Sequence, residues 1–183
     1  MVGRPRSEES RRAILKAALH LCARDGYQSV TLKGIAQEAG VGRQTLYRWW
    51  QTKAEVLLEA LIEIVSPKLA PLPRTEDHRA DLVSFLDRTF DLAGGPVGPI
   101  VVGLMADAQS DPALAATLRD QLIDRRRQAL REVLERGPLP AGMDVELLVD
   151  VIFGAMWYRL LNRHAPVDRS LAHELGDLVA RIA

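Results

Sequence analysis

The spacing of apolar residues predicts helices along the whole chain. Apolar side chains recur every three or four positions, and the strict alternation of a half-buried strand is nearly absent. Glycine and proline interrupt this pattern, because glycine favours helix ends and proline breaks helices. We therefore expect about nine helices, near residues 8–24, 31–38, 43–49, 52–64, 76–93, 97–109, 112–136, 144–163 and 168–182.

A cluster of prolines divides this all-α chain in two. Pro67, Pro71 and Pro73 follow the fourth predicted helix and interrupt its pattern. We expect a small N-terminal domain over residues 1–60 and a larger helical bundle over residues 61–183. A length of 183 residues and an apolar fraction of 48% allow a substantial core.

Charge is distributed unevenly between these two parts. The formal net charge is zero, which taken alone argues against a nucleic-acid binder. Residues 1–60, however, carry ten Lys and Arg against six Asp and Glu, whereas the other 123 residues carry fourteen against eighteen. Only the N-terminal part therefore carries an excess of positive charge, which would attract a polyanion such as DNA.

Residues 31–50, TLKGIAQEAGVGRQTLYRWW, have the pattern of a helix-turn-helix. Two short helices flank Gly40, at which a positive φ is easily adopted. Apolar side chains on both helices would pack against the first helix of the chain, namely Leu32, Ile35, Ala36, Ala39, Val41 and Leu46. The second short helix would then lie in a DNA major groove.

The side chains left on the outer face match the chemistry of DNA. Arg43 reads guanine, Gln44 reads adenine, and the methyl group of Thr45 packs on thymine. Groups suited to phosphate occur at Thr31, Tyr47 and Lys53. Further basic residues are Arg4 and Arg6, on an N-terminal arm that would enter a minor groove, and Arg48, which either touches phosphate or faces solvent.

Residues 8–60 resemble the DNA-binding domain of the TetR family of bacterial regulators. The resemblance lies in Gly26-Tyr27, Thr31-x-x-x-Ile35-Ala36, Ala39-Gly40-Val41, Thr45-Leu46-Tyr47 and Lys53-Ala54-Glu55. It implies that positions 43, 44 and 45 face bases and that positions 31, 47 and 53 hold phosphates. Two departures are Gly42, where the family often has Ser, and the pair Trp49-Trp50, of which either ring could be the buried one.

The C-terminal part resembles the ligand-sensing and dimerisation domains of the same family. Its last two helices are more apolar than peripheral helices need to be, with stripes formed by Val145, Leu148, Val149, Ile152, Met156 and Leu160, by Phe153, Trp157 and Leu161, and by Leu171, Leu175, Leu178 and Ile182. One stripe can face the core, and the second needs another partner. A homodimer through a four-helix bundle supplies it; a monomer with one thick core is the alternative.

Aromatic residues and methionines between residues 76 and 163 are candidates for lining a ligand pocket. They are Phe85, Phe90, Leu104, Met105, Phe153, Met156, Trp157 and Tyr158, and for each of them simple packing in the core is the favoured alternative. The run Arg125-Arg126-Arg127 has three interpretations: a solvated helix face, a partner for Asp107 and Asp111, or a site for an anionic ligand.

Other classes of protein find little support in the sequence. Cys22 is the single cysteine, which excludes an intrachain disulfide, and the four histidines are too dispersed to predict a metal site. We find no catalytic constellation and expect no cofactor. No apolar run approaches the length of a membrane span, and the polar N-terminus lacks the features of a secretion signal, so we expect a cytoplasmic protein without a membrane partner.

Together these features predict a DNA-binding transcriptional regulator. We expect a repressor that leaves a pseudo-palindromic double-stranded operator when an unknown small-molecule effector binds, although no residue excludes activation. The alternative is a DNA-binding regulator without such a ligand, controlled by a protein partner. An enzyme housed in the C-terminal helices is a third, less favoured interpretation.

Overall fold

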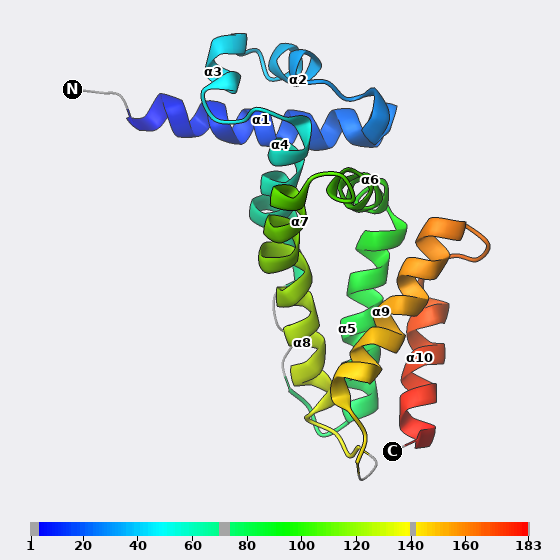
Figure 1. The fold of residues 1–183 in the computed structure, drawn as a ribbon. Coiled ribbons are helices and arrows are strands. Elements are labelled where there is room, and N and C mark those ends of the chain that lie inside the picture. Colours follow the sequence, from blue (N-terminus) through cyan, green and yellow to red (C-terminus); the bar gives the residue numbers. More distant parts are fainter. Residues whose placement is uncertain (1–3, 70–73, 140–141, 183) are drawn as a thin grey trace. The chain divides into compact units, whose positions relative to one another are not determined.

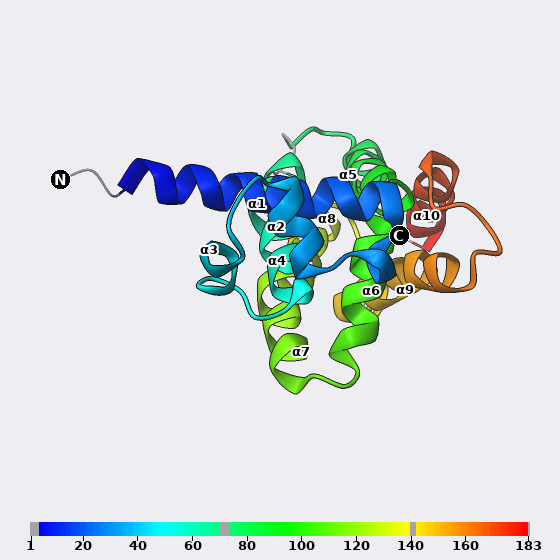
Figure 2. The ribbon, with the colours of Figure 1, turned by 90° about the horizontal axis from the view of Figure 1, so that it is seen from above.

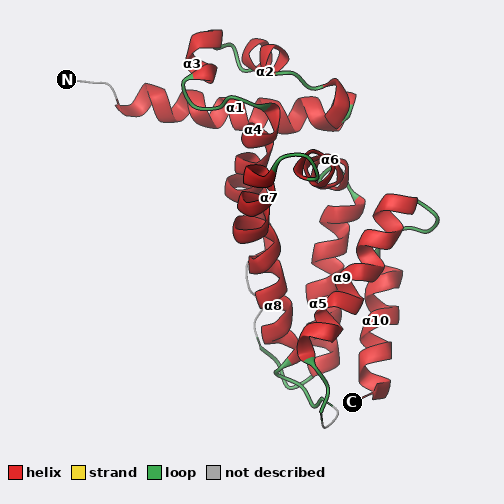
Figure 3. Ribbon diagram, viewed as in Figure 1, coloured by secondary structure: helices red, strands yellow, loops and turns green. Residues whose placement is uncertain are grey.

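The computed structural model describes residues 4–69, 74–139 and 142–182, and every regular element among them is a helix (Figure 3). The predicted all-α fold is confirmed. The helices form two compact units, one containing the chain up to Lys68 together with Pro99–Leu118, the other containing Leu69–Gly98 and the chain from Arg119 onward. These units are defined by contacts between residues, whereas the predicted boundary at residue 60 separates a DNA-binding domain from a ligand-sensing and dimerisation domain. That boundary stays a prediction.

The first unit is built around α1, with α2 and α3 along one side of it and α4 on the other (Figure 1). A π-helical segment, Leu61–Val65, and a 3-10 turn, Ser66–Leu69, continue α4. The side chains of Ile14, Leu15, Ile35, Leu46 and Leu57 are at most 1% exposed and form the centre of this unit. Its helices are α1 (Arg4–Asp25), α2 (Leu32–Glu38), α3 (Arg43–Tyr47), α4 (Lys53–Ala60), α6 (Gly98–Ala108) and α7 (Pro112–Leu118).

The start of α1 differs from the prediction. The helix begins at Arg4 rather than near residue 8, so the backbone of Arg4 and Arg6 is helical and not an extended arm. Pro5 lies in the first turn, where its missing N–H has no intrahelical partner to lose. The side chains of Arg4 and Arg6 lie outside the described residues, and their role at a minor groove stays a prediction.

Local sequence signals set the other boundaries of the first unit. The Thr31 and Thr52 hydroxyls accept hydrogen bonds from the backbone N–H groups of Gly34 and Glu55, at 3.1 and 3.2 Å, and so cap α2 and α4. Gly40 has φ of 66°, as expected for the turn between α2 and α3. These local signals therefore set where α2 and α4 begin and where the chain turns between α2 and α3.

The second unit packs α5 against α10, with α8 and α9 beside them (Figures 1 and 2). The predicted helix at 112–136 is one run of α7, a π-helical segment Arg119–Ile123 and α8, and the boundary between the two units falls within it. The helices of this unit are α5 (His78–Gly94), α8 (Asp124–Leu134), α9 (Val145–Asn162) and α10 (Arg169–Ile182).

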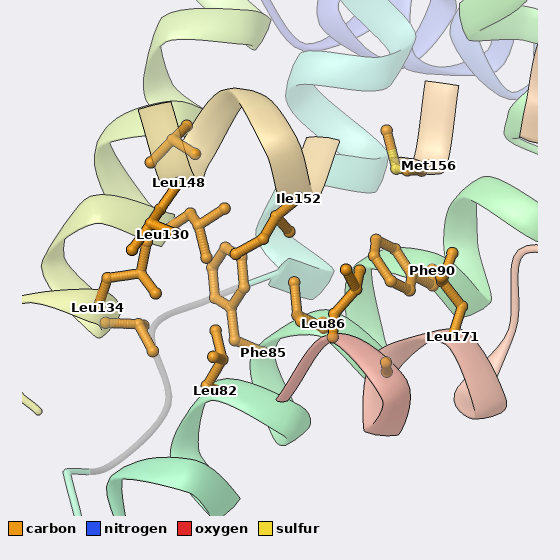
Figure 4. Packing of buried hydrophobic residues seen from close by; sticks show 14 of the residues in the cluster. Leu82, Phe85, Leu86, Phe90, Leu130, Leu134, Leu148, Ile152, Met156 and Leu171 are labelled. Carbon is orange, nitrogen blue, oxygen red and sulfur yellow. The ribbon is translucent and has the colours of Figure 1, made fainter. Parts of the chain in front are cut away.

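The core of the second unit is a single apolar cluster. Figure 4 shows Phe85 and Phe90 of α5 gathered with Ile152 and Met156 of α9 and Leu171 of α10. All five side chains are at most 8% exposed. One stripe of α9 therefore faces the core of its own unit, as the sequence allowed.

The other apolar face of α9 is exposed. Leu147, Val151, Tyr158 and Leu161 are 46–63% exposed, and their spacing places them along one side of the helix. Of these four, the predicted stripes contained only Leu161. Because α9 is apolar nearly all round, periodicity alone could not say which face the core would take.

Among the described residues, no single helix is both long enough and apolar enough to cross a membrane; only a bent pair, α5 with α6, reaches that length and composition together.

The cap of α4 gives a first prediction. Thr52→Ala removes the oxygen that accepts from the Glu55 N–H, so we expect the free energy of unfolding to fall by about 1 kcal/mol. Thr52→Ser keeps that oxygen and serves as the matched control. Urea denaturation measures both variants; equal losses for Ala and Ser would show that the hydroxyl does not cap the helix.

Candidate nucleic-acid interface

The short helix α3 is held by a few buried residues. Leu46 is fully buried, and Ile35 and Ala36 of α2 are at most 2% exposed. These side chains pack α2 and α3 onto α1, since five residues alone are too few for a stable helix. The position of α3 is therefore set by packing.

The opposite face of α3 carries the residues predicted to contact DNA. Arg43 and Gln44 are exposed, Thr45 is half-buried, and Tyr47 is 44% exposed. The predicted roles of Arg43 and Gln44 toward bases, and that of Tyr47 toward phosphate, are developed under the proposed function.

Gly42 leaves the start of α3 without a side-chain cap. Its backbone is extended, with φ of −68° and ψ of 143°, and no side chain accepts a hydrogen bond there. The Thr45 N–H donates to the Gly42 carbonyl at 3.0 Å, whereas no side chain caps the N–H groups of Arg43 and Gln44, which can therefore donate to an external acceptor such as a phosphate oxygen.

Of the two adjacent tryptophans, Trp50 is the buried one. Trp50 is 2% exposed, and its indole N–H donates to Glu59 of α4 at 2.7 Å. Trp49 is half-buried, with the guanidinium groups of Arg11 and Arg48 at 5.7 and 5.9 Å from its ring. The exposed side chain of Arg48 thus lies beside an aromatic ring immediately after α3, and contact with phosphate stays its predicted role.

An ion-pair network joins α1 to α4 below this aromatic pair. Arg11 pairs with Glu8 on α1, with Glu59 on α4, and with Glu63 in the π-helical segment that follows. These carboxylates raise the pKa of the Arg11 guanidinium, and the hydrogen bond to Glu63 contributes most. Because Glu59 also accepts from Trp50, the network ties the end of the helix-turn-helix to α4.

Lys53 makes contacts that the sequence did not reveal. Its ammonium donates to the backbone carbonyls of Tyr27, at 2.8 Å, and Gln28, at 3.4 Å, and lies 4.5 Å from the centre of the Tyr27 ring. Lys53 therefore joins the start of α4 to the turn that follows α1. The third N–H of the ammonium could still donate to a phosphate, which stays a prediction.

Tyr27 also binds α6 within the same unit. Its hydroxyl donates to Asp107 at 2.6 Å, and its ring packs so close to Gly103 that an added Cβ would lie 2.3 Å from ring atoms. Burial, together with the bond to Asp107, raises the pKa of the Tyr27 hydroxyl far above its usual range. The side chain is 4% exposed and stays protonated as a donor.

The first unit also contains the single cysteine of the chain, Cys22. Cys22 is 2% exposed, and burial raises the pKa of its thiol to about 11, so it stays protonated at neutral pH. The described residues contain no group of three or more His, Cys, Asp or Glu side chains that could hold a metal ion.

The eight predicted pocket residues are not gathered in one place. Five belong to the apolar core of the second unit or pack against it: Phe85, Phe90, Phe153, Met156 and Trp157. Leu104 is buried and Met105 half-buried in the first unit. Tyr158 is 63% exposed and lies edge-on to His164. Their shared role in lining a ligand pocket stays a prediction.

Two open depressions occur on the second unit, and none of the eight residues lines them. One, of about 560 Å³, lies where the start of α5, the end of α8 and the end of α10 meet, around His78. The other, of about 570 Å³, lies between the end of α5 and the start of α10 and is lined mainly by charged residues, including Asp87, Arg88 and Asp91.

Comparison with known proteins places both parts of the chain. Residues 14–60 match the family described as bacterial regulatory proteins, tetR family, and residues 72–179 match the tetracyclin repressor-like C-terminal domain. The HTH-type transcriptional regulator YdeS of Bacillus subtilis is 32% identical over 94% of this chain and 89% of its own length.

Solved structures show the same fold. The TetR family transcription regulator SCO0332 is 33% identical, with a TM-score of 0.74 over 96% of this chain and 99% of its own. The regulator FadR from Bacillus subtilis, solved in complex with stearoyl-CoA, has a TM-score of 0.67 over 92% of this chain and 96% of its own, at 21% identity.

The bond between Tyr27 and Asp107 can be measured by a double-mutant cycle. Tyr27→Phe keeps the ring packing and removes the hydroxyl, and Asp107→Ala removes the acceptor. We expect a coupling of about 1–3 kcal/mol in the free energy of unfolding, because the acceptor is charged. Additive losses in the double variant would show that the two groups do not interact.

Proposed function

The chain belongs to the tetR family of bacterial regulatory proteins, and on that premise we propose that it is a repressor which a small molecule releases from a pseudo-palindromic operator. It acts in the cytoplasm, where bacterial operator DNA lies. One observation carries the proposal: α3 exposes Arg43 and Gln44 while Leu46, on the same short helix, is fully buried.

The chemistry of α3 suits an operator. Arg43 donates two hydrogen bonds to the O6 and N7 atoms of guanine, and Gln44 pairs in the same bidentate way with adenine. The uncapped amides at Gly42 and the Tyr47 hydroxyl bind the flanking phosphates. These phosphate contacts set the register of the helix in the groove, and the base contacts supply sequence preference.

Two copies of the chain associate through α9 and α10. Exposed apolar side chains occur on α9, namely Leu147, Val151, Tyr158 and Leu161, and on α10, where Leu178 and Ile182 are 46% and 38% exposed. A water-exposed apolar face of this length is unusual in a monomer. A two-fold four-helix bundle covers it and sets two recognition helices about 34–36 Å apart, one turn of DNA.

Release by a ligand requires a path to the DNA-binding helices. Within the first unit, α7 contacts α4, and Asp107 at the end of α6 accepts from Tyr27. A ligand that moves α6 or α7 therefore changes the support of α1 and α4. The stearoyl-CoA complex of the Bacillus subtilis FadR supports small-molecule binding by this fold, and a ligand that favours the moved state lowers operator affinity.

Operator binding tests the roles of the exposed residues. With an operator selected from random DNA, Arg43→Ala should weaken binding by about 1–3 kcal/mol and relax the preference at one base pair. Tyr47→Phe should weaken operator and unrelated DNA by the same factor, about 3- to 10-fold. Gel-shift titrations at fixed salt measure both variants.

Arg125→Ala, an exposed position on α8, is the control and should bind as the parent does. If Arg43→Ala and Tyr47→Phe also bind as tightly as the parent, the assignment of this face to DNA is wrong. If an operator is bound but a metabolite library never weakens that binding, control by a protein partner replaces the small molecule.

The dimer face is tested by placing charge on it. Val151→Glu should shift the chain from dimer to monomer at micromolar concentration, because two buried carboxylates would face each other across the two-fold axis. Light scattering after size-exclusion chromatography measures the mass. Glu132→Lys, on the exposed side of α8, should leave the dimer intact; a Val151→Glu dimer, or a monomeric parent, would contradict the interface.

A further inference from the structure

Arg126 is a charged group in the second unit that the chain itself leaves largely unpartnered. Its Nη2 donates to the Thr89 hydroxyl at 2.7 Å, and its guanidinium carbon lies 4.5 Å from the centre of the Phe85 ring. Its Nε is buried and makes no hydrogen bond, and within the described part of the chain no carboxylate forms an ion pair with it.

This guanidinium remains charged. Burial lowers the pKa of Arg126 to about 10, with the positive charge of Arg88 adding to the effect. A group with that pKa is protonated at neutral pH. A buried charge without a counter-ion is costly, and buried guanidinium groups are ordinarily paired with an anion.

Two other arginines of the same helix are paired with carboxylates. Arg127 pairs with Glu146 and Asp150 of α9, and Arg131 also pairs with Glu146. Among the described residues, carboxylates of α9 thus pair with the side of α8 that carries Arg127 and Arg131, and none pairs with Arg126.

Thr89 and Phe85 hold Arg126 in a fixed orientation. Thr89 is 7% exposed; its hydroxyl donates to the Phe85 carbonyl at 2.8 Å and accepts from Arg126, so its hydrogen-bonding capacity is committed on both sides. The Phe85 ring supports one face of the guanidinium. The remaining N–H groups are thus oriented before any ligand arrives, and such preorganisation favours planar anions.

The surroundings of Arg126 are apolar. On its own helical side, Leu122 and Ile123 lie one turn earlier and are half-buried, and Leu130 lies one turn later and is fully buried. A ligand that reaches the guanidinium therefore places an apolar body against these side chains. The chemistry that fits is an anionic head on an apolar body.

We propose that Arg126 is the anion-binding residue of the effector site, and that the effector carries a carboxylate or a phosphate attached to an apolar group. This inference rests on the proposed ligand-controlled function and names the chemical class of its ligand. Arg126 forms the charge pair, Thr89 and Phe85 orient it, and the half-buried side chains of Leu122 and Ile123, just before α8, accept the body of the ligand.

Three probes with the same ten-carbon chain test the proposal: decanoate, decyl phosphate and decanol. Decanoate or decyl phosphate should raise the melting temperature of the full-length protein by about 3–6 °C at about ten times its dissociation constant, whereas decanol should not. The stronger of the two anions identifies the head group as carboxylate or phosphate.

Arg126→Met keeps the length of the side chain and its contact with Phe85 but removes the charge. We expect this variant, which also loses the hydrogen bond to Thr89, to respond to neither anion. Arg126→Lys should keep a weakened response. Arg125→Met, at the exposed neighbouring position, should respond as the parent does.

The proposal is overturned if both anions leave the parent unchanged, if decanol acts as strongly as they do, or if Arg126→Met responds as the parent does. Operator binding, measured in parallel without probe, separates the two hypotheses: its absence refutes the proposed function, whereas an intact operator complex with no anion response refutes only the role of Arg126.

Discussion

The first unit depends on one buried side chain, Tyr27, where three helices meet. The Lys53 ammonium at the start of α4 covers its ring and binds its carbonyl, Gly103 of α6 packs against the ring, and Asp107 accepts from its hydroxyl. An aromatic ring that carries a donor is needed for all of these contacts. Since Tyr27 follows α1 directly and precedes α2 by only a few residues, its position sets where the helix-turn-helix begins.

A second set of contacts fixes the other end of the helix-turn-helix. Glu59 accepts from both Arg11 and Trp50, so α1, α4 and the segment after α3 share one carboxylate. With Tyr27 at one end and Glu59 at the other, α3 has little freedom to shift relative to α1. A recognition helix of five residues can present a defined surface to DNA only under such constraint.

Local signals in the sequence were sufficient for most helix boundaries, and long-range contacts were not predictable from them. Thr31 and Thr52 cap helices as their spacing indicates, because a cap involves residues three positions apart. The ammonium of Lys53 instead binds carbonyls 25 and 26 residues away, which no local pattern records. On α9, apolar residues on both faces left the choice of core face to tertiary packing, so Val151 was missed as a surface residue.

The run of three arginines on α8 shows why identical neighbours acquire different roles. Successive residues of a helix point about 100° apart, so the three side chains face three environments: Arg125 faces solvent, Arg127 meets the carboxylates of α9, and Arg126 enters the apolar side toward Phe85. Treating the run as one basic patch would hide this difference. Arg126 contacts Thr89 and Phe85 of α5 but has no counter-ion among the described residues, and departures of this kind from ordinary folding rules are expected where a protein binds something else.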